Sequence, residues 1–217
     1  MTDERLADQF SFEKLADWLG PGWLPSFTSP PSQGFHCTRK GWAESILAEG
    51  FKPQDRKRDG SSKNRRLGPA VYFFVEGVPS KVSGKDAALL YGTRWRGWGD
   101  PAVLCSQLCL GAVVDLDSWP QWQKLIRHVE EELELQLERQ KRSSGAGSDG
   151  TMEELGLARE MPLRIAANLL RDAVGVDALL RWSPDLPGGD VCGYQTLAVL
   201  FPVEGKIGAT ECVNLYI

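Results

Sequence analysis

Histidine is scarce in this chain of 217 residues, occurring only at His36 and His128. The five cysteines form an odd set in which no two are spaced as Cys-x-x-Cys. Zinc sites are built from clustered cysteine and histidine ligands, so no metal site is expected. Unpaired thiols are typical of a reducing compartment. They predict a cytoplasmic or otherwise intracellular protein, although an injected toxin would look the same.

Long apolar runs are missing too. No stretch of the sequence approaches the roughly 18 apolar residues that cross a bilayer. The opening residues, Met1–Arg5, lack the basic start and apolar core of a signal peptide. A net charge of −4 gives no overall attraction to nucleic acid or to an anionic membrane. We therefore predict a protein with no membrane partner.

The composition that remains is ordinary for a globular protein, with 42% apolar and 25% charged residues. The length is enough for one domain with a substantial core. Strand-like segments stand towards both ends of the chain and helical segments between them, a pattern that predicts an α+β fold. The predicted strands are 35–38, 70–75, one or two strands within 102–116, 196–202 and 211–217.

The region 117–190 differs from the rest of the chain in its residue pattern. Apolar residues recur on one face of a helix predicted over 122–142, and a second helix is predicted over 163–174. The serine- and glycine-rich segment 143–150 between them is typical of a flexible linker. We therefore predict a single domain, 1–217, that carries a helical insertion at 117–190.

Three short fragments carry the candidate functional residues. Residues 34–38 read Gly-Phe-His-Cys-Thr, residues 68–74 read Gly-Pro-Ala-Val-Tyr-Phe-Phe, and residues 211–216 read Glu-Cys-Val-Asn-Leu-Tyr. Each is largely apolar and strand-like, so a histidine, a tyrosine and a glutamate are predicted on three separate strands. A helix predicted over 39–49 follows the first fragment and closes at Gly50.

This ordered set resembles the ADP-ribosyltransferase superfamily, and most closely its histidine–tyrosine–glutamate branch, which contains the poly(ADP-ribose) polymerases and the diphtheria-type toxins. Further matches are Ile-Leu-Ala-Glu-Gly-Phe at 46–51, a Ser-Lys pair at 80–81 and a second tyrosine, Tyr91. The resemblance covers roughly 34–91 and 195–217. It implies a split, mixed or antiparallel sheet with flanking helices, and an enzyme that cleaves NAD and transfers ADP-ribose.

The resemblance implies catalytic roles for three residues. Glu211 would hold a ribose hydroxyl and stabilise the oxocarbenium-like state that forms as the nicotinamide–ribose bond breaks. His36 would position the ribose through its imidazole, and Tyr72 or Tyr91 would stack on the departing nicotinamide. Plainer interpretations are a satisfied structural histidine, a core tyrosine and a solvated surface glutamate, with Glu204 as a competitor for the glutamate role.

The resemblance also places NAD contacts at Cys37, Thr38 and the basic loop 52–66. The backbone amide and carbonyl of Cys37 would clamp the carboxamide of nicotinamide. The loop holds seven lysines and arginines against two aspartates. Arg65 or Arg66 would meet the pyrophosphate of NAD or the phosphates of a nucleic-acid acceptor, although charge runs are usually solvated.

Two positions depart from the family pattern. Cys37 stands where the family usually has glycine, and 68–71 reads Gly-Pro-Ala-Val without the usual second glycine.

Our first prediction is an NAD-dependent mono-ADP-ribosyltransferase that uses a protein or nucleic-acid acceptor and no metal. The alternatives are an inactive binding module of the same fold and an NAD-using RNA 2′-phosphotransferase.

Overall fold

A computed structural model describes residues 12–52, 70–76, 82–144, 161–183 and 194–215. It confirms a mixed α+β class, with helices flanking a mixed sheet. The described residues divide into two compact units. A helical unit combines 12–25 with 119–175, and a sheet unit contains the remainder. Whether the helical unit is an insertion into one domain stays a prediction.

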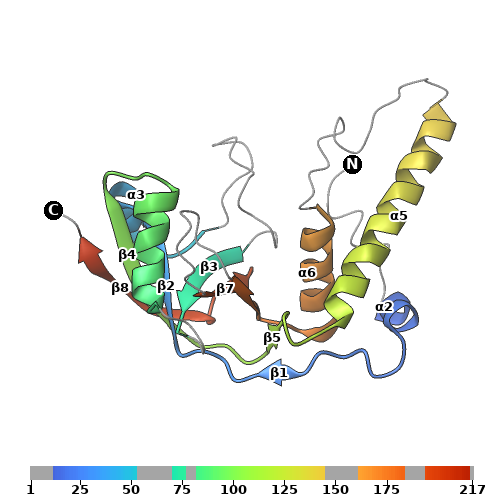
Figure 1. Ribbon diagram of the computed structural model, residues 1–217, viewed down its shortest axis with the longest axis horizontal. Helices are drawn as coiled ribbons and strands as arrows, with labels where there is room; N and C mark the ends of the chain where they lie inside the picture. Colours follow the sequence, from blue (N-terminus) through green and yellow to red (C-terminus); the bar gives the residue numbers. More distant parts are fainter. Residues whose placement is uncertain (1–11, 53–69, 77–81, 145–160, 184–193, 216–217) are drawn as a thin grey trace. The chain divides into compact units, whose positions relative to one another are not determined.

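The helical unit contains α2 (Phe12–Leu19), α5 (Gln121–Ser144) and α6 (Met161–Val174), and α5 packs against both of the others (Figure 1). The helices predicted over 122–142 and 163–174 are thus confirmed. In α5 the buried apolar residues recur every three or four positions, which places them on one face; they are Trp122, Leu125, Val129 and Leu133. Ser143 and Ser144 of the predicted linker end α5, and the rest of it lies outside the described residues.

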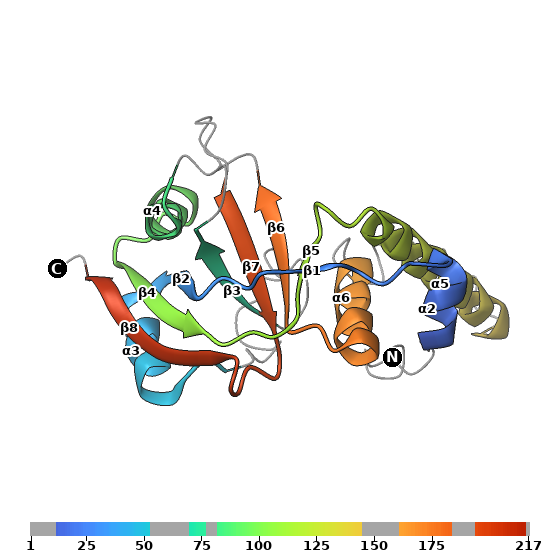
Figure 2. The ribbon, with the colours of Figure 1, turned by 90° about the horizontal axis from the view of Figure 1, so that it is seen from below.

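The sheet unit is built on eight strands within the described residues, in the order β1-β5-β6-β7-β3-β2-β4-β8 (Figure 2). Every neighbouring pair is antiparallel except β5 and β6. The strands are β1 (Phe27–Thr28), β2 (Gln33–Arg39), β3 (Ala70–Val75), β4 (Pro101–Leu108), β5 (Val113–Asp115), β6 (Ala178–Ser183), β7 (Tyr194–Leu200) and β8 (Ile207–Leu215).

Strand β6 lies within the range 117–190 that was predicted to be helical. Its short apolar run, Ala178–Leu180, follows directly after α6, and periodicity alone cannot separate such a run from a helix end. Pairing parallel to β5 requires a long connection, which the chain supplies through α5 and α6. The helices of this range therefore end at Val174, and residues 178–183 belong to the sheet.

Two helices pack on opposite faces of the sheet at β2 and β4 (Figure 2). On one face α3 (Lys40–Glu49) sets Ala43 and Ile46 against Ala102 and Leu104. On the other, α4 (Gly84–Leu90) sets Ala87 and Ala88 against Cys37, Phe74 and Val103. We call these sides the α3 face and the α4 face.

Local signals explain where both helices stop and start. The helix α3 ends before Gly50, as predicted, and the φ of 76° at this position is one that glycine adopts readily because it has no Cβ. Ser83 begins α4 as an N-cap, because its hydroxyl accepts a hydrogen bond from the Asp86 amide at 3.1 Å.

Candidate functional site

The strand order brings the three fragments together. Strand β2, with His36 and Cys37, lies between β3, with Tyr72, and β4, and β4 pairs in turn with β8, which carries Glu211. In register, Phe35 lies opposite Cys105, and Cys105 lies opposite Glu211. Residues that are far apart in the sequence thus lie within four adjacent strands.

The sheet opens between β2 and β3. These strands share one register pair, Phe35 with Phe74, whereas β2 pairs with β4 along all seven of its residues. Beyond Phe35 the ladder between β2 and β3 stops, at the level of Cys37 and Tyr72. The backbone groups of β2 and β3 beyond this pair therefore do not form a continuous ladder of hydrogen bonds between the two strands.

His36 bridges the opening from the α3 face. Its Nδ1 lies 2.9 Å from the carbonyl oxygen of Tyr72. Because a carbonyl only accepts, Nδ1 carries the hydrogen, and Nε2 of the neutral ring is left as an acceptor. Burial lowers the pKa of His36, and the hydrogen bond to Tyr72 opposes this in part, so the ring is neutral at physiological pH.

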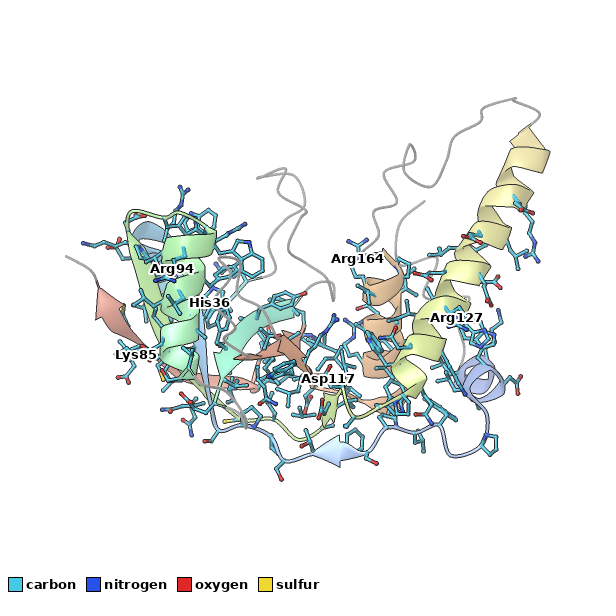
Figure 3. The ribbon with its side chains drawn as sticks, in the orientation of Figure 1. His36, Lys85, Arg94, Asp117, Arg127 and Arg164 are labelled. Atoms are coloured by element: carbon cyan, nitrogen blue, oxygen red, sulfur yellow. The ribbon has the colours of Figure 1, made fainter. Side chains whose placement is uncertain are left out.

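The ring of His36, which is labelled in Figure 3, also packs in an aromatic group. Its centroid lies 5.3 Å from that of Phe51 and 6.0 Å from that of Phe73, edge-on in both cases. Thr38, two residues along β2, is buried and shares the α3 face. His36 is therefore held by a hydrogen bond and two ring contacts, and Nε2 is the ring nitrogen that can accept a hydrogen bond.

Glu211 lies on the α4 face. Residues opposite each other in an antiparallel pair project to the same side, and its partner Cys105 is two residues from Val103, which packs in the α4-face cluster. The carboxylate is exposed. Burial raises the pKa of the Cys105 thiol, and the negative charge of Glu211 raises it further. A register shift between β4 and β8 lies just beyond Glu211, a feature that is frequent beside active sites.

Cys37 projects to the α4 face and fills the space there. A Cβ added to Gly92 would lie 2.4 Å from its Sγ, so thiol and glycine are in close contact. Burial raises the pKa of Cys37 to about 12, although a hydrogen bond with the backbone of Gly92 opposes the shift. The thiol is neutral and occupies volume that a glycine at this position would leave open.

Tyr91 begins a π-helical turn, η2 (Tyr91–Trp95), that continues α4. Its half-buried ring lies 5.6 Å from Phe74, 5.4 Å from Trp95 and 6.2 Å from Trp98, centroid to centroid. The guanidinium carbon of Arg96 lies 5.8 Å above the same ring. Turns of π-helix are rare and often occur at functional sites.

The predicted site residues therefore divide between the two faces. His36 and Thr38 are on the α3 face, and Cys37, Tyr91 and Glu211 are on the α4 face. Tyr72 alternates along β3 with Val71 and Phe73, which are buried in the core cluster that contacts Phe51, so it shares the side of Phe74. Arg65 and Arg66 lie outside the described residues.

Sequence reasoning missed the aromatic and cationic surroundings of Tyr91. Trp95, Arg96 and Trp98 all reach its neighbourhood because the wide turn brings residues five apart together. The available signal was the alternation of arginine and tryptophan in Arg-Trp-Arg-Gly-Trp at 94–98.

Neither a metal-binding cluster nor a membrane-spanning helix is present within the described ranges. Within them, no group of three or more His, Cys, Asp or Glu residues is placed to hold a metal ion. None of the helices in this part of the chain has the length and hydropathy to cross a bilayer.

Comparison with known proteins gives no match for this chain: no family model, no curated protein and no solved structure is similar to it.

Proposed function

We propose that this protein is an NAD-dependent mono-ADP-ribosyltransferase that moves ADP-ribose to a macromolecular acceptor. The observation that carries the proposal is the arrangement of the α4 face. An exposed carboxylate, Glu211, lies on the same side of the sheet as a half-buried tyrosine, Tyr91. The opening between β2 and β3 lies in the same group of four adjacent strands.

Glu211 supplies the charge that the reaction needs. Loss of nicotinamide leaves positive charge on the ribose C1′ and ring oxygen, and a nearby carboxylate stabilises that charge more than it stabilises the ground state. Val213, on the same strand, packs in the cluster that also contacts Tyr91. In this proposal the carboxylate and the ring act on the two ends of the bond that breaks.

Tyr91 is suited to hold the leaving group. Phe74, Trp95 and Trp98 contact the tyrosine ring and fix its orientation, so a nicotinamide ring would stack on it with little loss of side-chain freedom. The carboxamide would bond to the backbone of Cys37, where the ladder to β3 has ended.

His36 acts as a positioning residue in this scheme. Its neutral Nε2 accepts a hydrogen bond from a ribose hydroxyl, because Nδ1–H is already committed to the Tyr72 carbonyl.

One observation favours a second function, an inactive binding module with this fold. The Sγ of Cys37 packs against Gly92 on the face where nicotinamide would approach. A side chain there reduces the room for the nicotinamide ring, so the two functions differ in whether NAD is held at all.

The deciding experiment measures turnover of labelled NAD by the wild-type protein and by Glu211→Gln. We expect the substitution to reduce turnover by about 100-fold or more, since a preorganised charge aimed at the transition state is removed. Glu204→Gln is the matched control, because Glu204 is also an exposed glutamate, outside the proposed site. Equal turnover by Glu211→Gln and wild type would contradict the assignment. No turnover by wild type, with no thermal stabilisation by NAD, would favour the inactive module.

A further inference from the structure

The segment that follows α4 forms a surface of aromatic and cationic side chains. It consists of Tyr91, Arg94, Trp95, Arg96 and Trp98, and we call it the π-turn surface. Trp95 is 38% exposed, and both arginines are exposed. An exposed aromatic ring flanked by two exposed arginines presents a stacking face and positive charge to solvent at the same place.

The backbone holds this surface in a defined shape. The Arg96 amide donates to the Tyr91 carbonyl and the Trp98 amide donates to the Gly92 carbonyl, each at 3.0 Å. Trp95 is thereby kept edge-on to Tyr91. The guanidinium of Arg96 lies over two rings, 5.8 Å from the centroid of Tyr91 and 5.4 Å from that of Trp98. The surface is preorganised and does not need to be ordered by a ligand.

Space is open beside these rings. A Cβ added to Gly97 or Gly99 would meet nothing within 4 Å among the described residues, and both glycines are exposed. Gly97 has a φ of 61°, a left-handed conformation that side chains rarely adopt. A ligand backbone could therefore approach this loop closely.

The chemistry of the surface selects its ligand. Aromatic faces beside arginines bind flat, electron-rich rings linked to anionic groups, because stacking and charge-assisted hydrogen bonds act together. The stretch 91–99 contains two arginines and no acidic residue, within a chain whose net charge is −4. This local charge is complementary to phosphate, and the exposed ring is complementary to an unpaired base.

We infer that the π-turn surface docks single-stranded nucleic acid, which is the acceptor of the transfer. The inference of docking depends only on the features of this surface. The inference that the docked strand is the acceptor rests also on the proposed function. Duplex nucleic acid fits less well, because stacking between base pairs hides the ring faces that Trp95 would bind. The location suits transfer, since Tyr91 and Val213 of the strand that carries Glu211 pack against one cluster.

The transfer step needs no reagent other than NAD and the docked strand. The bond between ribose C1′ and the nicotinamide nitrogen breaks, and its electron pair leaves with neutral nicotinamide. A base nitrogen or a hydroxyl or phosphate oxygen of the docked strand forms the new bond to C1′. Where that atom carries a proton, the proton passes to Glu211 or to water.

The first test measures docking without NAD. Fluorescein-labelled oligo(dT) and oligo(U) of about 12 nucleotides, within the range of a typical single-strand site, are titrated with the protein and followed by anisotropy. We expect both oligonucleotides to bind. One should bind more tightly than the other if the protein contacts the 2′-hydroxyl groups of RNA. A DNA duplex of equal length should bind more weakly. Equal or tighter binding of the duplex, or no binding of either single strand, would overturn the inference.

Variants assign the binding to the surface. Trp95→Leu should weaken binding by about 5- to 100-fold, because it removes a stacked ring but keeps an apolar side chain, and Trp95→Phe should restore most of it. Trp182→Ala is the matched control: Trp182 is 37% exposed and lies on β6. Arg94→Gln should reduce the slope of log affinity against log salt by about 0.7. Equal losses for Trp95→Leu and Trp182→Ala would contradict the assignment.

A final measurement separates this inference from the proposed function. Labelled NAD is incubated with the protein and either oligonucleotide or with bovine serum albumin as a protein acceptor. Label on the oligonucleotide alone supports the acceptor role. Label on the protein alone overturns it and leaves the proposed function standing. Tight docking of the oligonucleotide without any NAD turnover would instead leave the docking surface standing and refute both the transfer and the acceptor role.

Discussion

The two faces of the sheet at β2 differ in how their polar side chains are held and in how far they are exposed. On the α3 face, His36 has committed Nδ1–H to the Tyr72 carbonyl and packs edge-on against Phe51 and Phe73. On the α4 face, Glu211 presents an exposed carboxylate on the side of the sheet that also carries Tyr91. One face holds its polar group in place, and the other leaves its charge accessible.

This difference separates positioning from chemistry. A buried neutral ring with one committed nitrogen orients a ligand but cannot stabilise much positive charge. An exposed carboxylate keeps its charge and becomes more effective when a ligand excludes water from it. Removal of the His36 ring should therefore act mainly on stability, and removal of the Glu211 charge mainly on turnover.

The largest expected effect on stability is that of His36→Ala. The change removes a packed ring and leaves the Tyr72 carbonyl without its His36 donor, so we expect the free energy of unfolding to fall by about 2–4 kcal/mol. Urea denaturation measures it. Glu211→Gln is the comparison from the other face and should change the free energy by less than about 0.5 kcal/mol, as exposed substitutions usually do. Similar values for the two variants would remove the distinction between the faces.

The second effect concerns the contact between Cys37 and Gly92 on the α4 face. Gly92→Ala would place a Cβ 2.4 Å from Sγ and 3.0 Å from the Cβ of Pro101. We expect a loss of about 1–3 kcal/mol from overpacking. Cys37→Ala in the same chain should recover part of that loss, and a double-mutant cycle of the four proteins measures the coupling.

Gly99→Ala is the control for this cycle, since its added Cβ meets nothing within 4 Å among the described residues. A cost for Gly92→Ala no larger than that for Gly99→Ala would show that Cys37 does not fill this space. The inactive-module alternative would then lose the observation that favours it.

Several parts of this fold could be predicted from the sequence because local signals agreed. The strand at 70–75 is an unbroken apolar run, and α3 ends at a glycine with positive φ. The region 102–116, predicted as one or two strands, contains two, β4 and β5. In contrast, β8 begins at Ile207, four residues before the prediction, because Gly208 resembles a turn residue although it lies within the strand, at a register shift against β4.

The division of the site between two faces could not be predicted. His36 and Cys37 are adjacent, so they must project to opposite sides of any strand. Which side meets Glu211 depends on the register of β2, β4 and β8, and register is a long-range property. The aromatic surroundings of Tyr91 were hidden for a similar reason, because a π-helical turn is not encoded by ordinary helical periodicity.

The third prediction concerns pH and returns to the α3 face. The pKa of His36 in the folded protein is lowered from its ordinary value of 6.5. Below that pH the unfolded chain binds a proton that the folded protein does not, so stability falls as the pH decreases. The decline continues until the folded pKa is reached.

His36→Phe keeps an aromatic ring but cannot titrate, so it should flatten the decline in stability that starts near pH 6.5. Thermal unfolding at a series of pH values measures this. Asp177 provides an internal reference at lower pH. Burial raises its pKa, but the amides of Ala112 and Gly111 and the Lys206 ammonium lower it more, so the carboxyl sits below its ordinary 3.8. Its contribution to stability is lost only as the pH falls from about that value through the folded pKa. An unchanged slope near pH 6.5 in His36→Phe would contradict the lowered pKa.

The smallest expected effect tests the electrostatics of the α4 face. The charge of Glu211 adds to burial in raising the pKa of Cys105, because a nearby negative charge disfavours the thiolate. Glu211→Gln should therefore lower that pKa slightly, and high salt should have a similar effect in the wild type, since salt screens the carboxylate. The pH dependence of iodoacetamide labelling measures it in a protein whose other cysteines are replaced by alanine. No change on Glu211→Gln would mean that the carboxylate points away from Cys105, and the placement of Glu211 on the α4 face would then have to be abandoned.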